Sequence, residues 1–189
     1  RDRDYILLFS IFTVGVISCF AMYSTDGGEL LYHSKNHAIR FGIFFVMMII
    51  ISFINIKFWH SVSYIFYFVV LLLLFFASFY GITASGSQRW INLYFLNLQP
   101  SELMKIAIII CFAKYYHRVQ LHSVNNFTTL AIPIVILIIP IFLVISQPDL
   151  GTSILIALSG IMVLWLAGIN IKYFVFASIV FVISAPFVI

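Results

Sequence analysis

Three ionisable side chains stand beside or inside long apolar stretches, where a charge is costly. Glu102 and Lys105 lie near the start of one stretch, and Asp149 precedes another. An ionisable group near the bilayer centre costs on the order of 2.5–3.5 kcal/mol on insertion scales, so these groups should face protein or water. Because residues three apart share a helix face, Glu102 and Lys105 are predicted to contact each other.

The surroundings of the two acids leave two interpretations open. Residues 99–102 (QPSE) and 147–149 (QPD) share the order of glutamine, proline and acid. Both segments fit helix starts, because proline suits the first turn and the helix dipole favours an acid there. In the alternative, Glu102, Lys105 and Asp149 form a buried cluster. One lysine then neutralises two carboxylates beside a polar pocket open to the outer face.

Two arginines and a tryptophan stand at the ends of apolar stretches. Arg40 fits a side chain that snorkels to the headgroups, and Arg89-Trp90 fits an interfacial belt. The same cations suit another role, since guanidinium groups match phosphate oxygens. Arg40, Arg89 and Lys105 are therefore candidate ligands for a lipid pyrophosphate at the outer leaflet.

Other kinds of catalytic site find no support in the sequence. The five histidines lack helical metal spacing, and Cys19 and Cys111 fall inside apolar runs, as expected of buried free thiols. No phosphate-binding loop, dinucleotide fingerprint, nucleophile elbow or metalloprotease helix is present. No metal ligands are predicted.

The composition requires a membrane protein. Of the 189 residues, 63% are hydrophobic and 8% charged, against about 45–50% and about 25% in typical globular chains. The apolar runs are long and uninterrupted, which favours helices over barrel strands. The net charge of +4 is spread over loops, without the basic block of a nucleic-acid-binding protein.

Charged residues divide the chain into about seven apolar segments long enough to span a bilayer. They are expected at about 5–23, 39–56, 61–83, 100–116, 128–146, 150–168 and 172–189. Together they form a single transmembrane domain. The last segment reaches Ile189 in mid-run, so we expect the front part of a longer protein.

The loop charges favour a cytoplasmic N-terminus. Inner segments then hold six lysines and arginines against three on the outer side. The six are Arg1, Arg3, Lys57, Lys114, Arg118 and Lys172, and the three are Lys35, Arg40 and Arg89. The outer face receives the loops 24–38 and 84–99 and the turn at 147–151.

Three motifs carry a resemblance to a known family. Residues 86–91 (GSQRWI), 99–105 (QPSELMK) and 147–153 (QPDLGTS) resemble the SEDS proteins of the bacterial cell wall, and the pattern within 151–168 favours the RodA branch over the FtsW branch. The resemblance covers the whole chain in order and spacing. It implies a ten-helix membrane enzyme, of which this chain is the front part.

The resemblance also implies an activity and a location. A SEDS protein of this branch polymerises lipid II into glycan strands at the outer face of the bacterial inner membrane, during elongation and shape maintenance. It works with a class B penicillin-binding protein and other membrane proteins of the elongation complex. No nucleic-acid partner is expected. A divalent cation, Mg or Mn, is the expected cofactor, with no ligands identifiable here.

The family pattern assigns roles to individual residues. Arg40, Glu102, Lys105 and Asp149 match polar positions around the central cavity, and Arg89-Trp90 matches the signature outer loop. The family's proposed catalytic aspartate lies beyond Ile189, so no catalytic residue is assigned in this chain, and the 189-residue piece alone should be inactive. Two alternatives to the polymerase are a lipid II flippase, which also needs a cationic cavity, and a non-catalytic scaffold for wall synthesis.

Overall fold

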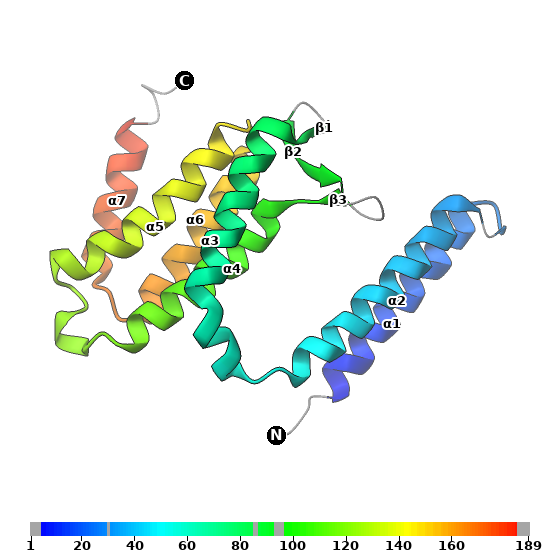
Figure 1. The fold of residues 1–189 in the computed structure, drawn as a ribbon, viewed down its shortest axis with the longest axis horizontal. Coiled ribbons are helices and arrows are strands. Elements are labelled where there is room, and N and C mark those ends of the chain that lie inside the picture. The colour runs from blue at the N-terminus through cyan, green and yellow to red at the C-terminus, as the bar shows by residue number, and fades with distance from the viewer. Residues whose placement is uncertain (1–4, 30, 85–86, 93–96, 185–189) are drawn as a thin grey trace. The chain divides into compact units, whose positions relative to one another are not determined.

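The computed structural model describes residues 5–29, 31–84, 87–92 and 97–184. The chain divides into two compact units, residues 1–55 and 56–189. Figure 1 shows the elements of both units. Helices dominate each unit, as the sequence predicts.

The first unit is a pair of neighbouring helices, α1 (Tyr5–Thr25) and α2 (Tyr32–Phe53), joined by a short connection (Figure 1). The ring of Phe12 packs against the rings of Phe41 and Phe45, with centroid distances of 6.5 and 5.5 Å. Ser18 Oγ and His37 Nε2 are 2.8 Å apart and hydrogen-bond across the pair. Aromatic packing and one polar contact thus join the two helices.

Helix α2 begins at Tyr32 rather than at residue 39, so the predicted loop 24–38 was too long. The apolar stretch marks only the part of a helix that suits lipid, whereas the helix itself continues through polar residues. The carboxylate of Asp26 supports the added turn, since the backbone N–H of Ser34 donates to Asp26 Oδ2 at 2.8 Å. Asp26 thereby satisfies one of the amides left free at a helix start.

The Asp26 contact predicts a pH-dependent signal. The hydrogen bond from the Ser34 amide holds the pKa of Asp26 below its ordinary value. A lowered carboxyl pKa means that the contact is complete above the unfolded value of about 3.9 and is lost as pH falls through the folded pKa. We expect the Ser34 amide chemical shift to titrate with a midpoint below the ordinary aspartate value. The titration should vanish in Asp26→Asn, and a wild-type midpoint at or above the ordinary value would contradict the contact.

The second unit is a helical bundle built around α3 and α4. It contains α3 (Ile56–Tyr80), α4 (Pro100–His117), the short 3-10 helix η1 (Leu121–Ser123), α5 (Phe127–Ile145), α6 (Leu150–Leu166) and α7 (Ile171–Ser184). Leu74 of α3, Ile108 and Phe112 of α4 and Ile156 of α6 are fully buried in one apolar core. Helices α5 and α6 approach closely at Gly160, where a Cβ would lie 2.5 Å from Leu137 Cδ1.

Two buried prolines interrupt the hydrogen bonding of α5, and two tyrosines compensate. In an α-helix the carbonyl of residue i accepts from the N–H of residue i+4, which proline lacks. Pro140 therefore frees the carbonyl of Ile136, and the Tyr67 hydroxyl donates to it at 2.9 Å. Pro133 frees the carbonyl of Thr129, and the Tyr115 hydroxyl donates to it at 3.1 Å. Helices α3 and α4 thus satisfy polar groups that lipid could not.

A small antiparallel sheet follows α3, within a stretch predicted to be a loop. The strands are β1 (Ile82–Ala84), β2 (Ser87–Asn92) and β3 (Asn97–Leu98), in the order β1-β2-β3. Strand β2 packs against both α3 and α4. The sequence holds a signal for this hairpin, because the dipeptide Ser85-Gly86 is typical of a tight turn between strands.

The described helices confirm the predicted helical fold and refine its boundaries. Helices α1, α2, α3 and α5 are long and apolar enough to cross a membrane. Helix α4 is not among them because it carries three charged residues, and α6 is not because it has only 17 residues. Helix α3 covers Ile56–Tyr80 rather than 61–83. The predicted last segment, 172–189, is described as far as Ser184, and residues 185–189 lie outside the described part.

Candidate functional site

The motif residues of the second unit gather at one end of the bundle, which we call the hairpin end. It comprises the end of α3, the strands β1–β3 and the starts of α4 and α6 (Figure 1). Helices α4 and α6 pack side by side, and β2 contacts α3 and α4. The fold therefore brings the third sequence motif to the same end as the first two, although 41 residues separate it from the second.

Glu102 and Lys105 form an ion pair on the first turns of α4. Lys105 Nζ donates to Glu102 Oε1 at 2.8 Å and to Oε2 at 2.9 Å. The lysine side chain is 21% exposed and the glutamate side chain 56% exposed. The predicted contact is confirmed. Glu102 also lies in the first turn after Pro100, where the helix dipole favours an acid.

Asp149 is buried and caps α6. Its Oδ1 accepts the backbone N–H of Thr152 at 3.2 Å, and its Oδ2 accepts the Thr152 hydroxyl at 2.8 Å. Between the described side chains Lys105 and Asp149 there is no ion pair, so the structure does not form the three-residue cluster. Both acids instead occupy helix starts, which is the other interpretation that the sequence left open.

Gln147 has a positioning role that the sequence motif did not reveal. Its side chain is buried, and Nε2 donates to the Leu74 carbonyl at 3.1 Å and to Ser78 Oγ at 2.6 Å. These contacts tie the connection between α5 and α6 to the end of α3. The sequence held one signal for this role, a glutamine at the end of an apolar run. A polar side chain buried there must find hydrogen-bond partners.

The other predicted site residues lie in β2 and in the first unit. Trp90 is partly buried in β2, paired in register with Ile82. Arg89 precedes it in the strand, and its side chain is outside the described part of the structure. Arg40 lies on α2 of the first unit, where it lines a cavity of about 140 Å³ together with His33 and His37.

Side chains of the kinds that bind metal ions do not cluster in threes within the described residues. Among them, no three histidine, cysteine, aspartate or glutamate side chains come together. His60 and His117 lie edge to face with ring centroids 5.3 Å apart, without a third such partner. A Mg or Mn ion shared with substrate phosphates needs only one or two protein carboxylates, so the expected cation stays a prediction.

The hairpin end carries charged and polar side chains on several elements. An ionic pair with one partly exposed lysine lies at the start of α4, and an arginine-bearing strand packs against the same helix. Asp149 and Gln147 are buried. Asp149 caps the start of α6, and Gln147 bonds to the end of α3. Within the pair, the more exposed charge is the Glu102 carboxylate, and Lys105 is bonded to both of its oxygens.

Comparison with known proteins agrees with the motifs. The family FTSW_RODA_SPOVE, described as "Cell cycle protein", matches residues 3–189. The chain is 36% identical over 152 residues to the "Probable peptidoglycan glycosyltransferase FtsW" of Buchnera aphidicola subsp. Schizaphis graminum, covering 78% of this chain and 43% of the relative. It is 32% identical over 169 residues to the "Peptidoglycan glycosyltransferase MrdB" of Escherichia coli K12, covering 88% and 44%.

Solved structures share the fold. A chain from a peptidoglycan synthase complex superposes with a TM-score of 0.80 at 21% identity, covering 97% of this chain and 55% of that one. The rod shape determining protein RodA of Thermus thermophilus gives a TM-score of 0.75 at 19% identity, covering 93% and 57%.

The matched relatives carry both FtsW and MrdB names, so the comparisons support no choice of branch. The chain spans less than half the length of the curated relatives it matches. Because the family pattern covers nearly the whole chain, the chain belongs to the FtsW/RodA/SpoVE family of cell cycle proteins, the SEDS family to which its motifs point.

Proposed function

We propose that the intact protein is a peptidoglycan glycosyltransferase that polymerises lipid II into glycan strands during cell elongation. The carrying observation is the family match, whose curated relatives are named peptidoglycan glycosyltransferases. The Glu102–Lys105 pair supports it, because a polar site at the end of an apolar bundle suits a lipid-linked anionic substrate. The 189-residue piece alone should be inactive, since the expected catalytic aspartate lies beyond it.

The proposed reaction is an inverting glycosyl transfer. A carboxylate base takes the proton from the acceptor sugar hydroxyl as the new glycosidic bond forms, and the lipid pyrophosphate leaves the donor sugar. The leaving group gains negative charge and needs positive partners. Arg40 and Arg89 are the proposed partners, and Lys105 organises the cavity through its pair with Glu102.

The proposal includes an orientation and a partner. The N-terminus lies in the cytoplasm, which puts the hairpin end at the outer face of the bacterial inner membrane. The partner is a class B penicillin-binding protein, which crosslinks the product. Support for the partner comes from the fold shared with a chain of a peptidoglycan synthase complex. Further membrane proteins of the elongation machinery complete the assembly.

A gel assay for glycan strands tests the proposed activity. Labelled lipid II is incubated with the intact protein and its penicillin-binding partner, and we expect a ladder of polymerised strands. As a control, Lys172→Gln should leave the ladder unchanged. This exposed lysine lies in the first turn of α7, away from the hairpin end.

Two outcomes would contradict the proposal. The absence of a ladder from a folded, partnered sample would exclude the polymerase, and lipid II crossing the bilayer of proteoliposomes in that same sample would favour the flippase. A ladder from the 189-residue piece alone would overturn the assignment of the catalytic base to a position beyond Ile189.

A further inference from the structure

The end of the second unit opposite the hairpin carries positive charge without any acid, and we call it the basic end. It comprises the start of α3, the end of α4, η1, and the starts of α5 and α7. The acids of residues 56–189 are Glu102 and Asp149, and both lie at the hairpin end. The basic end holds four lysines and arginines and three histidines: Lys57, Lys114, Arg118, Lys172, His60, His117 and His122.

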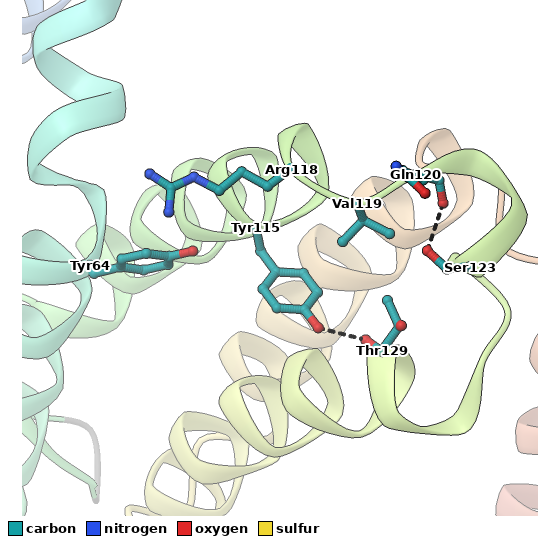
Figure 2. A pocket seen from close by; sticks show the side chains of 7 residues that line it. All are labelled: Tyr64, Tyr115, Arg118, Val119, Gln120, Ser123 and Thr129. Carbon is teal, nitrogen blue, oxygen red and sulfur yellow. Dashed lines mark hydrogen bonds between the residues drawn. The ribbon is translucent and has the colours of Figure 1, made fainter.

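A cavity of about 480 Å³ opens at the basic end between α3, α4 and α5. Figure 2 shows the side chains that line it, with Arg118 extending from the end of α4 toward the side lined by Tyr64. Tyr115 and Thr129 form another part of the wall, and Gln120 contributes from the connection to η1. The volume falls in the range of small-molecule sites, about 300–1,000 Å³.

Some polar groups of the cavity wall are hydrogen-bonded to each other, and others have donors that a ligand could use. The Tyr115 hydroxyl donates to the Thr129 carbonyl, and Ser123 Oγ donates to the Gln120 carbonyl at 2.9 Å (Figure 2). Within the described residues, neither the Tyr64 hydroxyl nor the Arg118 guanidinium has a hydrogen-bond partner. A phenol and a guanidinium therefore line the same cavity as unused donors.

Lys114 places a positive charge over the ring of Tyr64. The lysine side chain is buried, with Nζ donating to the Ser61 carbonyl at 2.8 Å. Nζ also lies 4.6 Å from the centroid of the Tyr64 ring. The long lysine stem reaches the backbone of the neighbouring helix α3. Lys114 thus holds Tyr64 at the cavity and raises the local positive potential.

We propose that this cavity binds a phosphate group, with the phosphate of an anionic lipid headgroup as its ligand. The Arg118 fork binds phosphate oxygens, and the Tyr64 hydroxyl donates a further hydrogen bond. Basic pockets between membrane helices bind anionic headgroups. The cavity lies at the charged end of α3 and α5, which are apolar enough to cross a membrane, and helices of that kind end near the headgroups.

Native mass spectrometry of the intact protein in detergent tests the site, with dioleoyl phosphatidylglycerol and dioleoyl phosphatidylcholine as probes. We expect the anionic lipid to bind more tightly than the zwitterionic one. Arg118→Gln should weaken phosphatidylglycerol binding by about fivefold or more, since one cation near a lipid surface contributes on that order. Arg118→Lys should fall between, because it keeps the charge and loses the fork. Tyr64→Phe provides a second variant if Arg118→Gln fails to fold.

The matched control is Lys172→Gln, which removes one charge from the same end at an exposed position outside the cavity. It should change phosphatidylglycerol binding by less than about twofold, because exposed charges are screened. Equal losses in Lys172→Gln and Arg118→Gln would overturn the cavity site, and so would equal binding of the two lipids.

A competition arm distinguishes the source of the phosphate. Lipid adducts that survive millimolar inorganic phosphate support the headgroup as ligand, whereas their displacement would overturn the lipid assignment and make the cavity a site for soluble phosphate. The readout is binding, so its failure is separate from any failure of glycan polymerisation.

Discussion

Replacing Lys105 with glutamine in the intact protein should reduce glycan-strand synthesis by about tenfold or more, equivalent to about 1.4 kcal/mol of transition-state stabilisation. The substitution removes the charge that binds both oxygens of Glu102. The glutamate then stands alone at the start of α4, and the proposed cavity loses its organising cation. Synthesis is measured as the initial rate of strand formation from labelled lipid II, normalised to folded protein.

An exchange of the two charges shows what the pair does. Glu102→Lys and Lys105→Glu should each impair synthesis, because each puts two like charges on neighbouring turns. The double exchange restores an ion pair and, if Lys105 organises the cavity through that pair, recovers most of the rate. A double variant as inactive as the single ones would show that position 105 itself needs the positive charge. An unchanged rate of synthesis in Lys105→Gln would show that the Glu102–Lys105 pair has no role in the proposed site.

Replacing Tyr67 with phenylalanine should lower the free energy of unfolding by about 1–2 kcal/mol. The substitution keeps the ring and removes the hydroxyl that donates to the Ile136 carbonyl. That carbonyl cannot use the usual partner, because residue 140 is proline. The loss is measured as reversible unfolding of the intact protein in bicelles.

A double-mutant cycle isolates this effect. Pro140→Ala restores the N–H that serves Ile136, so Tyr67→Phe should cost about 1 kcal/mol less in that background. Tyr80→Phe is the matched control on the same helix, since Tyr80 is exposed and its hydroxyl has no hydrogen-bond partner among the described residues. Equal costs of Tyr67→Phe with and without Pro140 would show that the tyrosine does not compensate for the proline.

The sequence alone predicted the helices, because their cause is local. A run of about 20 apolar residues must satisfy its backbone within itself, which leaves a helix as the solution. The contact of Glu102 with Lys105 was predictable for a similar reason, since a spacing of three residues sets their distance on one helix. The family motifs could be identified from the sequence because they are local patterns of residue types.

The sequence analysis missed features that depend on a turn or on packing rather than on a helical period. The start of α2 depends on Asp26 across a turn, and the strands β1–β3 form a sheet beside α3 and α4 rather than the expected loop. For Asp149 the sequence left open a helix start or a cluster with Lys105, and the structure shows it capping α6 through Thr152.

Only the tertiary structure decided which polar groups of different helices meet. Tyr67 and Ile136 are 69 residues apart, and Gln147 and Leu74 are 73 apart, so no helical or strand period links them. Packing of α3 against α4 and α5 brings these groups within hydrogen-bond distance. The cavity at Arg118 has the same origin, because its wall comes from α3, α4, α5, η1 and the connection after α4, which only packing brings together.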